Sequence, residues 1–342
     1  MKGRLSTKRA ILEPAREVKV CAEADVVVVG GGPAGVGAAI AAARTGAQTV
    51  LVERYGHLGG MATGGLVILI PHMSDGGREL QIAGLCQEMI DRLDAKGGAL
   101  HPRKQDLGSS APKLLSFWRN HFSVVVEEKV RFTVYPDPEL LKCVLNDMVE
   151  EVGVNLWLHS WGSRAITDGD TVKGIVFESK AGRQAILGKV TIDATGDGDI
   201  FASSGAEFDA KIDPQLRNSH LAVVFLLGNV DVKRFNEYKE AEQPRFGELM
   251  QELMKSVGFR LWPMSSWRND VVWVNNWVPG LSALDVKDLT WTEVNVRKAM
   301  LRTYELLKKN VPGFENCFIM ETASQIGTRG SRRLVGEYVV TK

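Results

Sequence analysis

Three glycines near the N-terminus could bind a phosphate group. Gly30, Gly32 and Gly35 follow the apolar run at residues 26–29 in the spacing G-x-G-x-x-G. In this spacing the first glycine permits a tight turn, the second lets the backbone approach a pyrophosphate, and the third lets a helix pack closely on a strand. The chemistry that these residues predict is the binding of a dinucleotide through its pyrophosphate.

The flanking sequence supplies the elements that would position this turn. Residues 26–29 are all valine, which is typical of a parallel strand buried on both faces. The alanine-rich stretch 34–43 predicts a helix whose partially positive N-terminus would point at the phosphates. Residues 49–52 predict the next strand, which ends at Glu53, where a carboxylate could accept hydrogen bonds from ribose hydroxyls.

The order of these features favours a dinucleotide site over a purely structural glycine turn. Strand, glycines, helix and terminal acid all occur within the length of one βαβ unit. An acid at position 53 disfavours a 2′-phosphate and therefore NADP. NAD and FAD both carry an ADP half, so the fingerprint alone does not separate them.

The composition bounds the class of protein. The chain has 342 residues, 44% of them hydrophobic, which is enough for a large core and predicts two domains. A net charge of +1 gives no electrostatic reason to expect nucleic acid or an anionic membrane as a partner. The N-terminal sequence lacks the apolar segment of a secretory signal, and no apolar run is long enough to cross a bilayer.

The cysteines indicate the compartment. They are far apart and lack the spacing of a metal site, so free thiols in a reducing compartment and no bound metal are expected. We therefore predict a cytoplasmic protein. The four residues are Cys21, Cys86, Cys143 and Cys317.

The sequence after Glu53 departs from a simple NAD-binding domain. A short loop contains Gly59, Gly60, Gly64 and Gly65, where backbone could approach a ligand closely. Roughly 70 residues then precede the next clear βαβ-like pattern, which is long for a connection within one domain. We interpret residues 71–129 as an inserted segment.

The regular pattern resumes with a helix that has a clear start signal. Asp137 is a favourable N-cap and Pro138 a favourable first residue. A strand is expected at 154–158, followed by two β-like runs joined through residues 181–182, which predict a β-meander crossover. A separate strand is then expected at 189–192.

The second half of the chain is less regular. We expect a strand within 219–231, amphipathic helices within 232–257, and a helix over 288–309 with Thr290 as its cap and Glu293 at capping-box spacing. A final strand is expected at 338–341. Aromatic side chains of a half-buried β region usually lie in its core, and an aromatic pocket is the alternative for Trp262, Trp267, Trp273 and Trp277.

Several motifs in order resemble the two-dinucleotide-binding-domain flavoproteins, most closely their FAD-dependent oxidoreductase branch. The resemblance covers nearly the whole chain. It implies an α/β fold, with a Rossmann-like FAD-binding domain (1–70 and 130–205), a mixed α+β substrate domain (206–330) and a return toward the FAD domain (331–342). Its motifs are the glycine turn, ERYGHLGGMATGG (53–65), PDPELLK (136–142), EEVGVNLWLHS (150–160), DATGDGD (193–199) and GTRGSRRLVGEYVVT (327–341).

The resemblance implies noncovalent FAD as the cofactor. His57 lies near the expected flavin loop, but its spacing does not match a flavin-linking motif. The implied FAD contacts are Gly30, Gly32, Pro33, Ala34 and Gly35 at the pyrophosphate, Glu53 and Arg54 at the ribose, Gly59, Gly60 and Met61 on the flavin side, and Thr195, Gly196 and Asp197 beside the cofactor.

The resemblance further implies transfer of a hydride from a small organic substrate to FAD, with oxygen or a separate acceptor reoxidising the flavin. Only one glycine fingerprint with a terminal acid is visible, so no second nicotinamide domain is expected. The alternatives are an NAD-dependent dehydrogenase and a truncated, noncatalytic nucleotide-binding protein.

Three residues are candidates for catalysis. Arg329 and Arg332 lie in a glycine-containing loop, and their guanidinium groups could bind a substrate carboxylate or the negative charge of a reduced flavin. A solvated arginine loop is the simpler alternative. His220 could act as a general base, and a hydrogen-bonded histidine at the start of a strand is the competing interpretation.

The resemblance also implies a segment that this sequence does not contain. Similar proteins continue past GEYVVT for about 100 residues, the length of a small domain. A helix in that segment would place its positive end near the flavin, where reduction develops negative charge. We therefore expect that a further segment or a second chain completes the flavin site.

Overall fold

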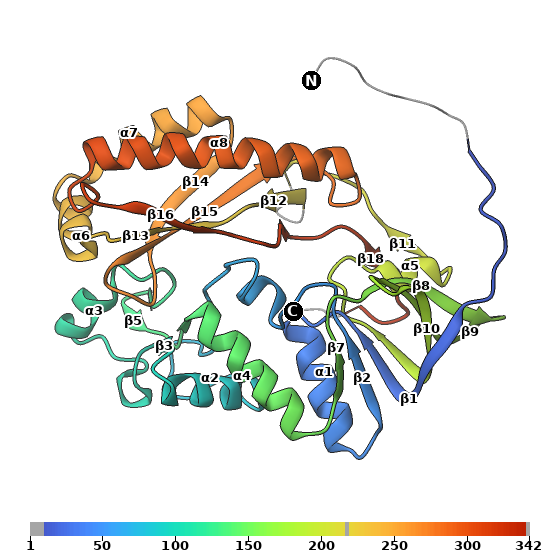
Figure 1. Ribbon diagram of the computed structural model, residues 1–342. Coiled ribbons are helices and arrows are strands. Elements are labelled where there is room, and N and C mark those ends of the chain that lie inside the picture. The colour runs from blue at the N-terminus through green and yellow to red at the C-terminus, as the bar shows by residue number, and fades with distance from the viewer. Residues whose placement is uncertain (1–9, 216–218, 340–342) are drawn as a thin grey trace.

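The computed structural model describes residues 10–215 and 219–339 and contains two six-stranded sheets. Figure 1 shows the sheet built from the N-terminal half at the lower right and the second sheet at the upper left, beneath two long helices. No helix among these residues is both long and apolar enough to span a membrane.

The first sheet contains the predicted strand, turn, helix and strand. Its order is β7-β2-β1-β10-β9-β8, and β1 pairs in parallel with both β2 and β10. The helix expected at 34–43 is α1 (Pro33–Arg44). The strands are β1 (Lys19–Val29), β2 (Thr49–Val52), β7 (Asn155–Trp157), β8 (Trp161–Asp168), β9 (Thr171–Ser179) and β10 (Gly182–Asp193).

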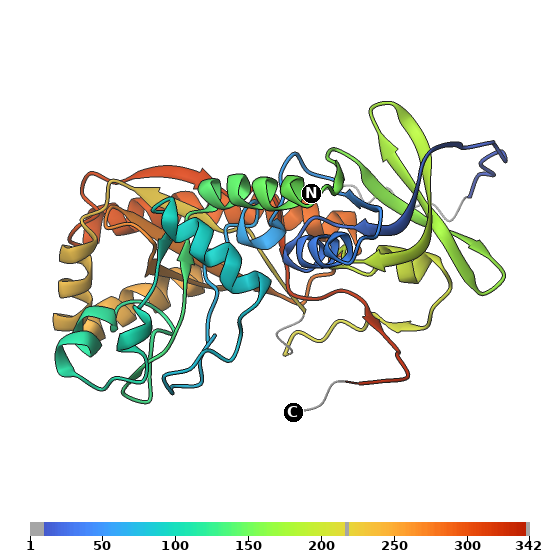
Figure 2. The same cartoon turned by 90° about the horizontal axis from the view of Figure 1, so that it is seen from below.

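The valine run of β1 explains how this sheet is covered on both faces. Side chains alternate along a strand, so Val28 packs with α1 and α4 (Pro138–Glu151), whereas Val27 and Val29 pack with the β8–β9 side. Figure 2 shows α1 in blue and α4 in green lying next to each other. The predicted start of α4 is confirmed, because the Asp137 carboxylate accepts hydrogen bonds from the N–H groups of Glu139 and Leu140.

The crossover is a β-meander, but its strands differ from the prediction. The run after residue 182 and the strand expected at 189–192 form one strand, β10. Gly188 lies within it, where an added Cβ would come 2.6 Å from a methyl of Val27, so this glycine allows close passage along β1. β8, which pairs with β9, was not predicted from the sequence.

The segment interpreted as an insertion folds into short elements beside α4. Arg92 of α2 forms ion pairs with Glu88 and with Glu151 of α4, and Glu88 also pairs with Arg44 of α1. The elements between β2 and α4 are η1 (Gly60–Ala62), α2 (Leu85–Ala95), β3 (Ala99–Leu100), η2 (Lys104–Asp106), α3 (Pro112–Trp118), β4 (Val125–Val126), β5 (Lys129–Val130) and β6 (Tyr135–Pro136).

The second sheet has the order β16-β13-β15-β12-β17, with β14 paired to β15. Its core includes residues of the three helices α6 (Val232–Ala241), α7 (Gln243–Val257) and α8 (Val286–Asn310). The amphipathic pattern at 232–257 thus forms α6 and α7. The strands are β12 (His220–Ala222), β13 (Phe225–Gly228), β14 (Arg260–Ser265), β15 (Val271–Pro279), β16 (Phe318–Thr322) and β17 (Gly327–Thr328).

The strand expected within 219–231 is two strands, because a side chain interrupts the ladder. The amide of Asn276 accepts a hydrogen bond from Val223 N at 3.1 Å and donates to Val223 O at 2.7 Å. The buried Asn276 amide thus takes the place of a neighbouring strand's backbone as the hydrogen-bond partner of Val223, which lies between β12 and β13.

Two further expectations in this half are corrected. The cap of α8 is Asp285, whose carboxylate accepts from Lys287 N, and Thr290 lies inside the helix, where its hydroxyl donates to Val286 O. Asp285 is the stronger cap because its short carboxylate reaches a free N–H of the first turn. Of the strand expected at 338–341, Tyr338 and Val339 are irregular, and the rest lies outside the described residues.

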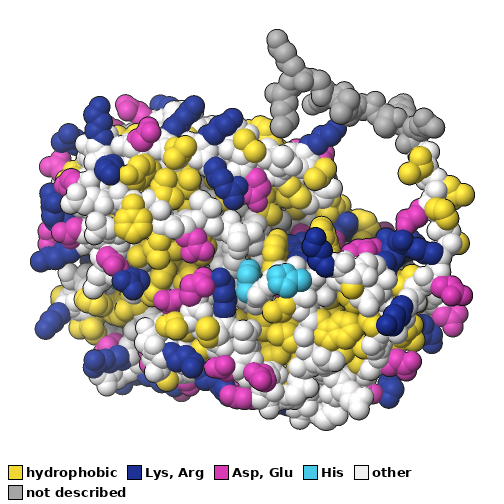
Figure 3. All heavy atoms as spheres, viewed as in Figure 1, with side chains coloured by type: hydrophobic (Ala, Val, Ile, Leu, Met, Phe, Trp, Pro, Cys, Tyr) yellow, Lys and Arg dark blue, Asp and Glu magenta, His cyan; other side chains and the backbone are white. Residues whose placement is uncertain are grey.

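The chain after β17 returns toward the first sheet. There β18 (Arg333–Leu334) pairs with β11 (Phe208–Asp209), close to α5 (Asp199–Ser203) in Figure 1. Basic and acidic side chains are interspersed over the face shown in Figure 3. All four cysteines are free, as the sequence predicted.

Candidate functional site

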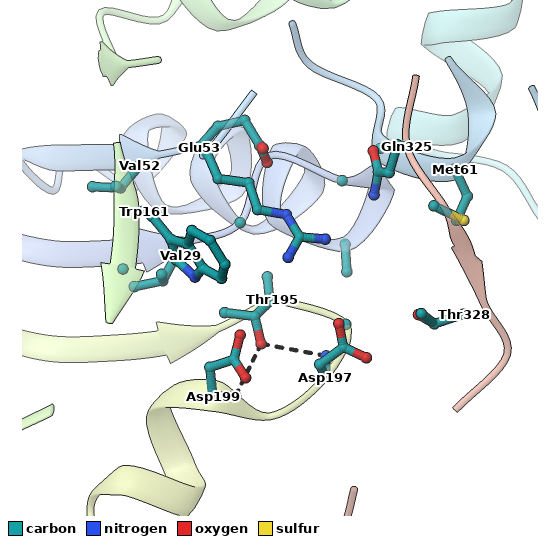
Figure 4. A pocket seen from close by; sticks show the side chains of 18 of the residues that line it. Val29, Val52, Glu53, Met61, Trp161, Thr195, Asp197, Asp199, Gln325 and Thr328 are labelled. Carbon is teal, nitrogen blue, oxygen red and sulfur yellow. Dashed lines mark hydrogen bonds between the residues drawn. The ribbon is translucent and has the colours of Figure 1, made fainter. Parts of the chain in front are cut away.

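A cavity of about 830 Å³ lies where the carboxyl ends of β1, β2 and β10 meet (Figure 4). Ligands of open α/β sheets bind at this edge, outside the carboxyl ends of the strands. The predicted cofactor residues line the cavity except for Gly35 and Gly59. Those that line it are Gly30, Gly32, Pro33, Ala34, Glu53, Arg54, Gly60, Met61, Thr195, Gly196 and Asp197.

The three glycines of the turn are needed for three different reasons. Gly30 has φ +102°, and a Cβ there would come 2.4 Å from the carbonyl oxygen of Ala194. A Cβ on Gly35 would lie 1.7 Å from the oxygen of Gly30, so only glycine lets α1 approach the turn. A Cβ on Gly32 would meet no atom of residues 10–215 or 219–339 within 4 Å, and Gly32 lines the cavity. It therefore leaves room for a group outside the protein.

Glu53 is held in place by backbone donors. Its buried carboxylate accepts hydrogen bonds from Gly31 N at 2.6 Å and from Tyr55 N at 2.7 Å. Each oxygen has a further lone pair, and the residue lines the cavity. The glycine turn and the acid that follows β2 are thus joined directly by one of these hydrogen bonds.

The turn after β10 is organised by Asp193, which the sequence analysis did not select. One carboxylate oxygen accepts from Thr195 N at 3.1 Å and from the Thr195 hydroxyl at 2.7 Å. The other accepts from Ile200 N at 3.0 Å and Phe201 N at 2.9 Å, at the start of α5. An aspartate two residues before a threonine in a strand-to-helix turn is a signal that could have identified it.

Asp197 is a buried carboxyl beside the cavity. Burial raises its pKa, and the Ser331 hydroxyl, which donates to it at 2.8 Å, acts in the opposite direction. Arg332 donates to Asp197 O and to the Asp199 carboxylate, each at 2.8 Å. The loop after β17 therefore closes on the DATGDGD turn.

The far wall of the cavity comes from η1 and from the segment that leads into β17 of the second sheet. Figure 4 shows Met61, Gln325 and Thr328 on one side and Glu53 with Trp161 on the other. Gln325 and Thr328 were missed, although they flank the start of the GTRG motif. The other lining residues that the sequence analysis missed are Val29, Val52, Ser160, Trp161, Gly162, Ala194 and Asp199.

None of the three proposed catalytic side chains lines this cavity. Arg332 is committed to the DATGDGD turn. His220 and Arg329 lie together, since Arg329 N donates to His220 O at 3.3 Å. The Arg329 guanidinium lies 5.7 Å from the centre of the Trp277 ring, and His220 Nδ1 is a buried nitrogen with no hydrogen-bond partner among the described residues.

The tryptophans take different positions. Trp273 is buried in the core of the second sheet and its indole N–H donates to Leu66 O at 2.8 Å. The indole N–H of Trp267 donates to the Asp137 carboxylate at 3.0 Å, which ties the second sheet to α4. Trp277 instead lies between Arg260 and Arg329.

His57 packs against the glycine loop. Its ring stacks on Tyr55 with a centroid distance of 5.6 Å, and burial lowers its pKa. A Cβ on Gly64 would lie 2.3 Å from the His57 ring, so this glycine provides space for it. His57 does not line the cavity.

The residues present fit a ligand larger than ADP, such as a dinucleotide that contains an ADP half. At Gly32 a Cβ would occupy space at the N-terminus of α1, where backbone N–H groups and the helix dipole favour a pyrophosphate. Glu53 suits ribose hydroxyls. The cavity then continues past Asp197 to Met61 and Thr328, so it provides lining for a second half of the ligand.

Replacing Trp161 by alanine is expected to weaken FAD and ADP binding equally, roughly tenfold. The Arg54 guanidinium lies 5.8 Å from the Trp161 ring centre, and this pair borders the cavity beside Glu53. Stacking of a base on an aromatic side chain contributes about 1–3 kcal/mol. Isothermal titration with each nucleotide measures the change, and Trp291→Ala on the surface of α8 is the control. We expect equal effects because the adenine base, which FAD and ADP share, would stack on Trp161. Weakened FAD binding with unchanged ADP binding would contradict this placement of the adenine.

The model of the FAD dependent oxidoreductase family matches residues 25–342. No curated protein matches the chain. Among solved structures, the chain is similar to a geranylgeranyl bacteriochlorophyll reductase-like protein from Thermoplasma acidophilum, with 15% identity and a TM-score of 0.51 over 90% of this chain and 66% of that one.

Two monooxygenase structures are also similar. One is p-nitrophenol 4-monooxygenase from Pseudomonas putida DLL-E4, with 14% identity and a TM-score of 0.50 over 88% of this chain and 66% of that one. The other is a flavin-dependent monooxygenase in complex with FAD and substrate, with 16% identity and a TM-score of 0.51 over 90% of this chain and 50% of that one. The chain thus spans about two thirds or less of their lengths, and the likeness confirms the predicted α/β fold.

Proposed function

This chain belongs to the FAD-dependent oxidoreductase family, and from that premise we propose that it passes a hydride from a small organic substrate to noncovalently bound FAD. FAD is the family's cofactor, as the sequence predicted. When bound, it supplies the electron-accepting chemistry, while the protein supplies binding, orientation and electrostatics.

The observation that carries this proposal is the extent of the cavity. It continues from the glycine turn and Glu53 to Met61 and Thr328, at the junction of the two sheets. Gly32 and the N-terminus of α1 would hold the pyrophosphate, and Glu53 the ribose. Beyond the ADP half, the backbone at Gly60 and the Met61 side chain would border the flavin.

The substrate would lie against the second sheet. His220 pairs with Pro279 across β12 and β15, and Trp277 is two residues before Pro279, so His220 and Trp277 share a face of the sheet. Arg329 contacts both residues. We propose that the Arg329 guanidinium binds an anionic group of the substrate and that His220 Nδ1 holds or accepts a proton there. Arg332 is a positioning residue for the DATGDGD turn.

The two alternatives have less support. An NAD-dependent dehydrogenase would continue its parallel sheet through another helix, whereas here the meander β8–β9–β10 follows β7. A noncatalytic nucleotide-binding protein would need no cavity beyond the ADP half.

We also propose a cytoplasmic location, which the four free thiols support, and a further segment or second chain that completes the flavin site.

The absorbance spectrum of the protein purified without added cofactor tests the proposal. We expect flavin bands near one FAD per chain, and bleaching of these bands when a substrate is added without oxygen. The released nucleotide is identified by mass spectrometry. A colourless protein that takes up no added FAD, or one that releases NAD, would contradict it, and flavin that no substrate in a broad panel reduces would favour the noncatalytic alternative.

A further inference from the structure

A second cavity lies far from the glycine turn, between the end of α3 and the helices α6 and α7. It measures about 830 Å³ including its open mouth, and it shares no residue with the first cavity. In both ribbon views, α3 and α6 lie at the same end of the molecule (Figures 1 and 2). The proposed oxidoreductase function uses none of its residues.

Two cationic side chains line this cavity, one from each of two walls that are far apart in sequence. Arg119 follows α3, and Lys239 lies on α6. Asn120 donates to the Glu240 carboxylate at 2.5 Å, so the two walls are fastened together. Glu240 also lines the cavity, and its negative charge acts on Lys239. Arg119 forms an ion pair with Glu128 at 3.9 Å, and both side chains of this pair are exposed.

Lys239 is a half-buried cation with spare hydrogen-bond donors. Its Nζ donates to the Asn236 side chain at 3.3 Å and lies 5.2 Å from the centre of the Phe235 ring. The salt bridges of α6 are formed by Lys233 and Arg234. Lys239 forms none with the residues that the structure describes, and the Glu240 carboxylate acts on it only from a longer distance. An ammonium group has three donors, and burial of this one lowers its pKa, because the charged form is only partly compensated. An anion in the cavity would compensate it.

The rest of the cavity is suited to an apolar body. Trp262 and Phe246 both line it, and their rings pack edge to face at 5.4 Å. Gly247 lines it from the interior of α7, where glycine is unfavourable compared with alanine. A Cβ at Gly247 would meet no atom of the described residues within 4 Å. No contact with the part of the chain that the structure describes therefore requires glycine here, and the missing side chain leaves space in the cavity.

We propose that this cavity binds a small organic carboxylate whose apolar part is about the size of one aromatic ring. The carboxylate would pair with Lys239 and Arg119, and the apolar part would pack on Trp262. Such a ligand would bridge α3 and α6, the two walls that the Asn120–Glu240 hydrogen bond already joins. Charge-assisted hydrogen bonds to this half-buried ammonium supply the affinity, and the aromatic wall selects the apolar body.

Calorimetric titration of the purified protein with phenylacetate tests the proposal, with phenylacetamide as its uncharged counterpart. We expect phenylacetate to bind at least tenfold more tightly than the amide. Lys239→Met is expected to weaken phenylacetate binding at least tenfold. The matched control is Lys233→Met, on the exposed side of the same helix, which should leave the affinity unchanged.

A second variant fills the space instead of removing the charge. Gly247→Leu is expected to abolish phenylacetate binding while the melting temperature stays the same or rises, because leucine favours the helix. Equal binding of acid and amide, no measurable binding of phenylacetate, or binding that Lys239→Met leaves unchanged would overturn the proposal. Binding that perturbs the flavin spectrum and survives Gly247→Leu would likewise overturn it and place the ligand at the first cavity.

Discussion

Replacing Gly32 with valine is expected to weaken FAD binding at least a hundredfold without unfolding the protein. The substituted side chain would extend into the cavity at the N-terminus of α1, where the pyrophosphate needs direct access to backbone N–H groups. A hundredfold loss corresponds to about 2.8 kcal/mol of binding free energy.

The backbone at this position accepts valine. Gly32 has φ −69° and ψ −177°, an extended conformation that suits a residue before proline. A Cβ there lies more than 4 Å from every atom that the structure describes outside its own chain neighbours. The free energy of unfolding should therefore change by less than about 0.5 kcal/mol, as for most substitutions that disturb no contact.

The control is Gly37→Val in the same helix. A Cβ at Gly37 also meets no atom within 4 Å, but this residue does not line the cavity. Flavin content per chain and the affinity for added FAD are measured for both variants, together with urea unfolding. Stoichiometric FAD in the Gly32 variant would rule out this pyrophosphate site. Loss of FAD in both variants would show that the effect comes from the helix and not from the cavity.

Replacing Asp193 with alanine is expected to lower the free energy of unfolding by about 3 kcal/mol or more and to abolish tight FAD binding. The carboxylate accepts four hydrogen bonds, three from backbone N–H groups and one from the Thr195 hydroxyl. Hydrogen bonds to charged groups contribute about 1.5–3 kcal/mol each, and donors that lose their acceptor retain their desolvation cost. Without Asp193, the turn that carries Thr195 and Asp197 loses its shape.

Two further substitutions distinguish the loss of hydrogen bonds in the turn from the general effect of removing a negative charge. Asp193→Asn keeps one oxygen acceptor and should retain part of both stability and FAD affinity. Asp209→Ala removes an exposed carboxylate paired with Arg333 and should change neither substantially. Urea denaturation followed by tryptophan fluorescence gives the stability, and titration gives the FAD affinity. An Asp193→Ala variant with unchanged unfolding would show that the turn is held by other contacts.

The elements predicted well are those whose signals are local. The strand, glycine turn, helix and acid at 26–53 follow from backbone sterics and short periodicities, and they form as expected. The start of α4 at Asp137 was predicted for the same reason, because an N-cap contacts donors two and three residues away. The α8 start was wrong, since two residues with capping side chains compete there and only the fold shows that Asp285 is used.

The elements predicted poorly depend on partners distant in sequence. β10 is continuous because it pairs along β1, and β12 ends before β13 because the Asn276 amide occupies the backbone of Val223. Neither partner is visible in the local pattern. The catalytic candidates show the same limit, since the sequence placed Arg329 and Arg332 in one loop but the fold directs them to different neighbours.

The sequence by itself determined the strand, glycine turn and helix at 26–44 and the acid that follows β2, and its motifs indicated the family, because these depend on residue types at fixed short spacings. The tertiary structure alone decided which side chains close the cavity. Gln325 and Thr328 face Glu53 across it although about 270 residues of chain separate them, a distance that local propensity cannot encode. It also decided where the charge of Lys239 is partly buried, because burial results from packing between α6 and its neighbours and not from the residues beside it in the chain.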